Sequence, residues 1–168
     1  ELLIRAINII VTEKKINRLK VSFVGGAITN SDKKYLFGLK NLIRGNNLQN
    51  FVDFVGVVPH KDIASLYNSA DLSVNLCPTG GMDKAVLESM LCGLPVIVLN
   101  KTFSEILGQY YSKLMLNNDS AEELSAKILT MMKISSHEIS LIGSELRLVA
   151  EKTHNLCNLI EKIIKFFK

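Results

Sequence analysis

Residues 95–100 read Pro-Val-Ile-Val-Leu-Asn, and this stretch decides the fold class of the 168-residue chain. Four apolar residues in a row, three of them β-branched, favour a short strand over a helix. Such a strand is apolar on both faces, which is typical of a parallel sheet that helices cover on both sides. We therefore expect a parallel sheet buried within the chain.

Outward from this stretch, short apolar runs alternate with helical patterns. The predicted strands are residues 20–25, 51–56, 72–77 and 95–100, with a weaker candidate at 113–116. The predicted helices are residues 1–18, about 32–45, about 61–70 and about 82–92, and then 124–132, about 136–151 and 153–167. The alternation predicts a doubly wound α/β domain with a helical C-terminal tail, without repeats or an interdomain linker.

Local signals place several helix ends. Ser31 and Asp32 are expected to start the second helix, and Ser120 with Glu123 resembles a capping box. Gly93 is expected to end the helix at 82–92, because glycine closes a last turn and the proline two residues later bars continuation.

Composition excludes several classes of protein. With 48% hydrophobic and 21% charged residues, the chain can bury enough apolar surface to fold, so disorder is excluded. Its length fits one compact domain, or at most two very small ones, and no run approaches the eighteen or so apolar residues of a membrane-spanning helix. Cys77, Cys92 and Cys157 are odd in number and widely spaced, which favours reduced thiols in the cytoplasm over disulfides or a metal site.

The net charge of +4 is concentrated at the C-terminus. Residues 152–168 hold four lysines against one glutamate, and the remainder lacks the basic stripe of a nucleic-acid-binding protein, so we expect no nucleic-acid partner. The same segment carries an apolar stripe beside its lysines: Leu156, Leu159, Ile160, Ile163, Ile164 and Phe167. This helix would either dock onto its own domain or a missing one, or contact an anionic membrane surface.

Ligands of open parallel sheets bind beyond the carboxyl ends of the strands. The loops expected there are residues 25–27, 57–60, 78–84 and 100–102. In the third loop, Gly80 and Gly81 follow a strand and open a helix, whose unblocked backbone N–H groups would attract phosphate. The alternative reading of these glycines is a tight turn.

Two charged residues of the following helix strengthen the ligand hypothesis. Lys84 lies in the first turn, where a cation opposes the helix dipole, so it would serve an anionic ligand such as a diphosphate. Glu88 lies in a mostly apolar helix, and its carboxylate needs hydrogen-bond donors to offset its desolvation. Ribose hydroxyls would supply them, and so would Lys84 or Ser89 in the absence of a ligand.

Two longer blocks share their order and spacing with a known family. The first is FVDFVG at 51–56, VPHKDI at 58–63 and LYNSADL at 66–72; the second is LESM at 87–90 and GLPVI at 93–97. Together they resemble the C-terminal, nucleotide-sugar-binding domain of family 4 retaining GT-B glycosyltransferases, the glycosyl transferases group 1. The resemblance implies a Rossmann-like sheet that forms the C-terminal half of a GT-B fold.

The resemblance also implies a function. Residues 1–168 would be a single donor-binding domain without its N-terminal acceptor domain, and the substrate would be a nucleotide sugar such as UDP- or GDP-sugar, with no cofactor. Transfer would retain the anomeric configuration, to a glycan or lipid-linked acceptor in polysaccharide biosynthesis, in the cytoplasm or at the membrane surface. No residue of this chain is expected to be catalytic or to bind metal. The alternative is a non-catalytic nucleotide-sugar-binding or partner subunit.

Donor binding is expected from the strand-end loops and the helix that follows. The candidate residues are Gly25, Gly26, Val58, His60, Lys61, Thr79, Gly80, Gly81, Met82, Asp83, Lys84, Leu87 and Glu88. By the resemblance, residues 57–61 lie against the base and residues 79–82 lie near the diphosphate and the donor sugar, while Glu88 binds the ribose hydroxyls. His60 has the alternative of being a simply exposed loop residue.

The sequence departs from the family pattern in three places. Gly80 stands eight residues before Glu88, where the family has the first glutamate of a pair. In a shortened loop, Asp83 and Lys84 stand where the family has glycine and an apolar residue; Asp83 would replace the missing carboxylate, and Lys84 would face the diphosphate. The arginine and lysine that grip the diphosphate in the family would lie upstream of this chain, so the fragment alone is not expected to catalyse transfer.

Overall fold

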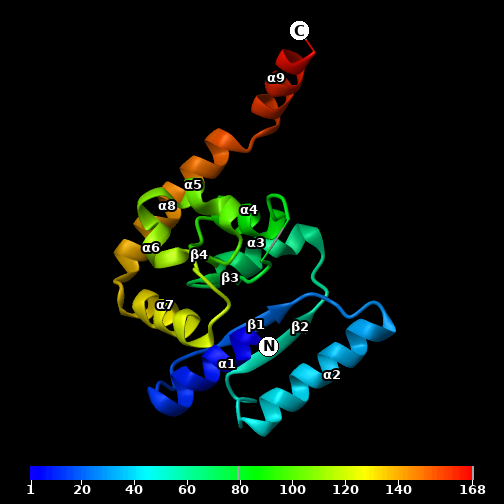
Figure 1. The fold of residues 1–168 in the computed structure, drawn as a ribbon, viewed down its shortest axis with the longest axis vertical. Helices are drawn as coiled ribbons and strands as arrows, with labels where there is room; N and C mark the ends of the chain where they lie inside the picture. Colours follow the sequence, from blue (N-terminus) through cyan, green and yellow to red (C-terminus); the bar gives the residue numbers. More distant parts are fainter. Residues whose placement is uncertain (79, 168) are drawn as a thin grey trace. The chain divides into compact units, whose positions relative to one another are not determined.

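The computed structural model describes residues 1–78 and 80–167. The chain packs as two compact units, the first comprising Glu1–Ile63 and Asp119–Leu129 and the second Ala64–Asn118 and Thr130–Lys168. Each unit contains a pair of parallel strands together with helices (Figure 1). The predicted α/β fold with parallel strands is confirmed, whereas the single-domain organisation stays a prediction.

The first unit is built on the parallel pair β1 (Val21–Val24) and β2 (Val52–Gly56). Phe23 pairs with Phe54, and the register shifts directly after this pair. Paired residues of neighbouring strands point to the same face, and the two rings stack with their centroids 5.3 Å apart. This aromatic pair therefore marks the face of the strands that helices cover.

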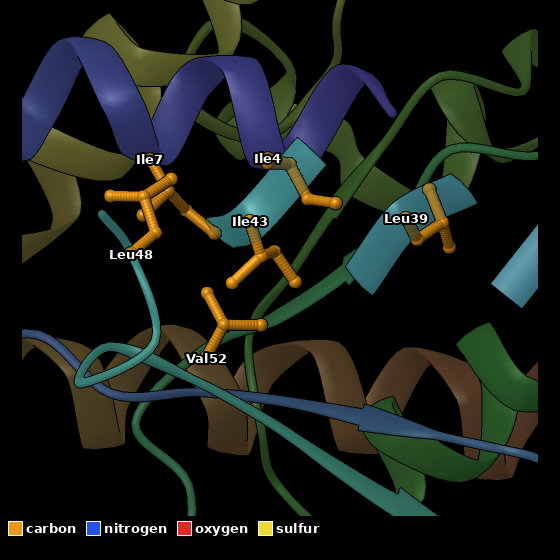
Figure 2. Close-up of a cluster of buried hydrophobic side chains, with 6 residues drawn as sticks. All are labelled: Ile4, Ile7, Leu39, Ile43, Leu48 and Val52. Carbon is orange, nitrogen blue, oxygen red and sulfur yellow. The ribbon is translucent and has the colours of Figure 1, made fainter. Parts of the chain in front are cut away.

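Helices α1 (Leu2–Asn8) and α2 (Asn30–Gly45) both pack on that face. The buried core between them is drawn in Figure 2 and consists of Ile4, Ile7, Leu39, Ile43, Leu48 and Val52. On the opposite face, Val24 and Val55 are 43% and 44% exposed. Burial of both faces, which we expected of the whole sheet, is therefore not seen in this pair.

The helix predicted over residues 1–18 ends early. After α1 the chain continues in a π-helical segment, Ile9–Glu13, and stops there. Lys15 has a φ of 54°, a left-handed conformation that a right-handed helix does not accommodate.

The start of α2 also differs from the prediction, because Thr29 rather than Ser31 determines it. The Thr29 hydroxyl oxygen accepts a hydrogen bond from the Asp32 N–H at 3.1 Å, and the Asp32 carboxylate accepts one from the Thr29 N–H at 2.9 Å. This reciprocal box satisfies two backbone donors and lowers the pKa of Asp32. The helix therefore begins two residues before the predicted position, at Asn30.

Two further helices belong partly to each unit. These are α3 (His60–Asn68) and α7 (Ala121–Lys133). Ser120 precedes α7, and its hydroxyl oxygen accepts a hydrogen bond from the Glu123 N–H at 3.1 Å. The predicted capping role of Ser120 is confirmed.

The second unit is built on the parallel pair β3 (Ser73–Asn75) and β4 (Val96–Val98). All three residues of β4 have no exposed surface, which confirms that this strand is buried on both faces. Helix α4 (Lys84–Leu91) packs against it.

Short helical turns that the sequence did not predict follow β4. They are η2 (Lys101–Phe103), α5 (Ser104–Leu107), η3 (Gly108–Tyr110) and α6 (Tyr111–Leu114). The weaker strand predicted at 113–116 is confirmed only in its second half: its first two residues belong to α6, whereas Met115 forms a parallel bridge with Val98 and the Leu116 N–H donates to the Val98 carbonyl oxygen at 2.8 Å. Helices this short are too brief to show a periodic pattern.

The C-terminal part is helical, as predicted, with α8 (Ser136–Thr153) and α9 (Leu156–Phe166). The Ser135 hydroxyl caps α8 by accepting a hydrogen bond from the Glu138 N–H at 3.2 Å. Across residues 1–78 and 80–167, none of the helices combines the length and apolar character that crossing a bilayer requires.

Helix α8 passes very close to the turn that ends α4. Gly93, with a φ of 71°, ends α4 and confirms the predicted stop signal. A Cβ atom on Gly143 of α8 would lie 1.8 Å from the carbonyl oxygen of Gly93. The neighbouring Ile142 is 1% exposed, so the contact lies in the interior and has no room for a side chain at Gly143.

We expect Gly143→Ala to lower the free energy of unfolding by about 3 kcal/mol, because a backbone would have to move within a close-packed core. Gly38→Ala is the matched control, since Gly38 is also helical but its added Cβ would stand in open space. The control should gain about 0.5–1 kcal/mol from the reduced entropy of the unfolded chain. Urea unfolding followed by circular dichroism measures both, and similar values for the two variants would contradict the close packing.

Candidate functional site

The loop between β3 and α4 is tied to the ends of both strands of the second unit. Asn75, the last residue of β3, donates from Nδ2 to Oδ2 of Asp83 at 2.9 Å. Asn100, two residues beyond β4, donates from Nδ2 to the carbonyl oxygen of Gly81 at 3.2 Å. Because parallel strands end at the same edge, both amides reach one loop. The loop is therefore fixed at the carboxyl edge of the strand pair, where α/β folds bind ligands.

Asn100 is a buried polar residue whose hydrogen bonds hold this loop in place. It is 4% exposed, and its Oδ1 accepts a hydrogen bond from the Thr102 N–H at 3.0 Å. The hydroxyl of Thr102 in turn donates to the carbonyl oxygen of Gly80 at 3.4 Å. Since a buried amide is costly to leave unpaired, these bonds favour one position of the glycine loop relative to β4.

Asp83 caps α4 with its side chain. Its Oδ1 accepts a hydrogen bond from the Ala85 N–H at 2.9 Å, while Oδ2 accepts from Asn75, so both carboxylate oxygens already have partners. Helix α4 begins at Lys84. The expectation that the glycine pair opens the helix with unblocked N–H groups is therefore wrong, because the aspartate satisfies a donor of the first turn.

Gly80 adopts a backbone conformation that other residues avoid. Its φ is 118°, in a region that side-chain-bearing residues rarely occupy. The positive φ of Gly80 supports the interpretation of this position as a tight turn. A glutamate in place of Gly80, as the resemblance leads one to expect, would be strained by the same backbone.

Lys84 and Glu88 lie one turn apart on α4. Residues four positions apart on a helix share a face and are separated by about 6 Å along its axis. Lys84 is exposed and Glu88 is half-buried, so α4 offers a cation and a carboxylate directly after the loop. Of the apolar candidates, Met82 is 37% exposed and Leu87 is half-buried.

Tyr67 connects the end of α3 to the first turn of α4. Its hydroxyl donates to the carbonyl oxygen of Ala85 at 3.1 Å. The pKa of Tyr67 is raised from its ordinary value, first by burial and then by the negative charge of Glu88. The carboxylate of Glu88 therefore lies near enough to Tyr67 to act on it electrostatically.

The first unit brings its own two strand-end loops together. The Gly25 N–H donates to the carbonyl oxygen of Gly56 at 2.9 Å. A Cβ atom on Gly26 would lie 2.4 Å from Cγ2 of Val57, so the loop after β1 runs directly along the loop after β2. Absence of a side chain at Gly26 is what permits this approach.

The remaining candidates fall into three places. Val58 is half-buried and follows this contact in the chain, whereas His60 and Lys61 are the exposed first residues of α3. Thr79 lies outside the described residues. The structure thus brings together Gly25 and Gly26 with the loop after β2, places His60 and Lys61 at the start of α3, and gathers the described candidates of the second unit in the loop before α4 and on α4 itself.

Sequence reasoning missed four residues that shape the second unit's loop: Asn75, Tyr67, Asn100 and Thr102. The two asparagines did carry a signal, since each is polar and stands at the carboxyl end of an apolar run. Thr102 lies with Asn100 in the expected strand-end loop 100–102, but the partners of Tyr67 and Thr102, 18 and 22 residues away along the chain, cannot be found from a local pattern.

We expect Asp83→Ala to lower the free energy of unfolding by about 2 kcal/mol, since it removes both a helix cap and the partner of Asn75. Ser135→Ala is the matched control, because it removes the cap of α8 and should cost about 1 kcal/mol. Urea denaturation measures both. Equal losses would mean that Asp83 acts as a cap alone and does not fix the loop.

The pKa of Tyr67 gives a second test of the site. Because burial and Glu88 raise this pKa, stability from the neutral phenol is complete below pH of about 10 and is lost as the pH rises through the folded-state pKa. Glu88→Gln should shift the tyrosinate absorbance titration to lower pH, whereas Glu105→Gln, on an exposed position of α5, should not. An unchanged titration in Glu88→Gln would contradict the placement of that carboxylate.

Comparison with known proteins identifies the family. The family model described as glycosyl transferases group 1 matches residues 1–142. A search of curated proteins found no match. Among solved structures, HepE from Anabaena in complex with UDP is similar with a TM-score of 0.84 at 21% identity, over 99% of this chain and 44% of that one.

Two further structures agree on the fold. Sucrose-phosphate synthase from Thermosynechococcus elongatus has a TM-score of 0.79 at 20% identity, over 98% of this chain and 41% of that one. The C-terminal domain of the group 1 glycosyl transferase LpcC from Francisella tularensis has a TM-score of 0.77 at 20% identity, over 92% and 78%.

The chain spans less than half the length of HepE and of the synthase. Its fold matches the C-terminal half of GT-B glycosyltransferases, with strand-end loops where α/β folds bind ligands. With the family model matching most of its length, the chain belongs to the glycosyl transferases group 1.

Proposed function

We propose that this chain binds the donor of a retaining, family 4 glycosyltransferase, and that the donor is a nucleoside diphosphate sugar such as UDP- or GDP-sugar. The observation that carries the proposal is the loop that Asn75 and Asn100 fix at the carboxyl edge of β3 and β4. Lys84 and Glu88 follow this loop directly. Family membership supports the assignment, and the similar HepE structures hold UDP and UDP-glucose.

Lys84 and Glu88 are spaced as a nucleoside diphosphate requires. Ribose and diphosphate are adjacent groups of that ligand, and the two side chains start about 6 Å apart along one face of α4. The Lys84 ammonium would pair with the diphosphate as a point charge. The Glu88 carboxylate would accept hydrogen bonds from the ribose hydroxyls, which offsets the cost of its partial burial.

The backbone before α4 would supply the remaining diphosphate contacts. Since Asp83 already caps the helix, we assign these contacts to the N–H groups of Gly80, Gly81 and Met82. A Cβ on Gly81 would stand in open space, so a ligand can approach the backbone there. Leu87 adds an apolar contact on α4, and Thr79 stays a prediction.

Further candidates lie on the first unit. Five residues stay predicted donor contacts, and residues 57–61 are assigned to the base. The five are Gly25, Gly26, Val58, His60 and Lys61. The support for them is the resemblance together with the contact between the two strand-end loops.

In the proposed reaction, the bond between the anomeric carbon and the diphosphate breaks while the acceptor hydroxyl oxygen bonds to that carbon from the same face. The hydroxyl proton leaves to the departing diphosphate or to water. Lys84 and the loop amides would stabilise the negative charge that develops on the leaving group. The acceptor, a glycan or lipid-linked saccharide in polysaccharide biosynthesis, would be held by a separate N-terminal domain, and we place the reaction in the cytoplasm.

Isothermal titration of the chain with UDP-, GDP- and ADP-sugars tests the proposal. We expect one of them to bind, and Glu88→Ala to weaken it about 10- to 100-fold, which corresponds to losing a hydrogen bond to a charged group. Glu105→Ala, at an exposed site of α5, should bind as the unchanged chain does. Failure of all three sugars to bind, or equal binding by Glu88→Ala, would refute the site.

The separate roles of the two charged residues can be resolved with truncated ligands. Lys84→Ala should weaken the binding of the nucleoside diphosphate but not that of the nucleoside. Glu88→Ala should weaken the binding of both ligands. A deoxyribose analogue should bind the Glu88→Ala variant and the unchanged chain alike, because the hydroxyl partner is already missing.

A second function is favoured by Gly80, because its φ of 118° would strain the glutamate that the family pattern leads one to expect. The chain would then be a non-catalytic nucleotide-sugar-binding or partner subunit. Both functions require donor binding. Sugar transfer or donor hydrolysis by the full-length protein supports the enzyme, and binding without turnover supports the subunit.

A further inference from the structure

Two successive carbonyl groups of the loop before α4 are held from the end of β4. The Thr102 hydroxyl donates to the carbonyl oxygen of Gly80 at 3.4 Å, and Asn100 Nδ2 donates to that of Gly81 at 3.2 Å. Asn100 is itself held, because its Oδ1 accepts a hydrogen bond from the Thr102 N–H at 3.0 Å. Both carbonyl groups therefore point toward one short segment, residues 100–102.

The direction of these carbonyl groups fixes the direction of the next two N–H groups. The C=O and the N–H of a trans peptide point in opposite directions, and the structure has no cis peptide bond among the residues it describes. The Gly81 N–H therefore points away from Thr102, and the Met82 N–H points away from Asn100. Both donors lie on the side of the loop that faces away from residues 100–102.

These two N–H groups have no acceptor in the described part of the protein. Gly81 and Met82 are both exposed, and a Cβ on Gly81 would stand in open space. Successive backbone N–H groups on one side of a turn form a concave site that attracts anions. The pair is therefore open to a phosphate group of a bound donor.

A loop with two adjacent glycines needs such hydrogen bonds to keep these donors in place. Glycine has no side chain to restrict its backbone, so the peptide between Gly80 and Gly81 can rotate more readily than others. Rotation would turn the Gly80 carbonyl oxygen toward the position of the Gly81 N–H, where it would repel a phosphate. The hydroxyl of Thr102 opposes this rotation, because it holds the carbonyl oxygen on the other side.

We propose that Asn100 and Thr102 are positioning residues of the donor site, which direct the N–H groups of Gly81 and Met82 at the diphosphate without touching it. Donors that are already oriented bind an anion without the cost of reorganising the loop. Since this role rests on the proposed function, it concerns the same ligand. The affinity for the diphosphate, and not that for the nucleoside, depends on the hydrogen bonds from residues 100–102.

Isothermal titration of Thr102 variants tests this role, with UDP and uridine as the first probes and the guanosine and adenosine pairs after them. Thr102→Val removes the hydroxyl at an exposed position and keeps the size of the side chain, so the chain should stay folded. Its affinity for the nucleoside diphosphate should fall about tenfold, as expected for losing one hydrogen bond to a charged group, while its affinity for the nucleoside stays unchanged. Thr102→Ser, which keeps a hydroxyl, should restore the binding of the diphosphate.

Thr153→Val is the matched control. It also removes a hydroxyl that donates to a backbone carbonyl, that of Val149 at 2.6 Å, but it does so on α8, and both affinities should stay unchanged. Asn100→Leu, which is similar in size and uncharged, removes both hydrogen bonds of the amide. It should weaken the binding of the nucleoside diphosphate more than Thr102→Val does, and circular dichroism checks that each variant stays folded.

The outcomes separate the positioning role from the donor site itself. Failure of the unchanged chain to bind any of the three nucleoside diphosphates would refute the donor site, and the positioning role with it. If the unchanged chain and Thr102→Val bind the nucleoside diphosphate equally well, the positioning role alone is overturned. An equal loss of affinity for nucleoside and diphosphate would overturn it too, by indicating a general structural effect, as would failure of Thr102→Ser to restore binding.

Discussion

Burial of β4 on both faces is the constraint on which the second unit depends. Its three residues have no exposed surface, so helices and turns must cover it completely. Covering it brings α4 into contact with α8, where the backbone approach at Gly143 leaves no space for a side chain. Because β4 is buried, Asn100 two residues after it is buried as well, and its amide must form hydrogen bonds within the protein.

The position of the loop before α4 is a consequence of that buried amide. Asn100 needs a carbonyl acceptor, and Gly81 supplies it; Asn75 meets the same need from the end of β3 by bonding Asp83. The loop that precedes Lys84 and Glu88 of α4 is therefore held by hydrogen bonds from the ends of both strands, and supporting hydrogen bonds of this kind keep a candidate site in one geometry. In the second unit, the packing of the core around β4 therefore also sets the position of the candidate site.

In the first unit, the helices cover one face of the strand pair instead of both. Both of its main helices cover the face that carries Phe23 and Phe54, and the opposite face keeps Val24 and Val55 partly exposed. Its strand-end loops are joined through glycines, Gly25 by a backbone hydrogen bond and Gly26 by close approach. The first contact joins two backbone groups, whereas the second packs the side chain of Val57 against the bare backbone of Gly26.

The sequence by itself determined the order of the four strands and of the longer helices, the buried character of β4 and the stop at Gly93, because apolar period and glycine chemistry are local properties. It also pointed to Lys84 and Glu88, whose spacing is read along one helix. Only the tertiary structure decided that Asn75 donates to Asp83 and that Asn100 fixes the loop. Those roles are hydrogen bonds between residues brought together by folding, and a local pattern carries no information about such partners.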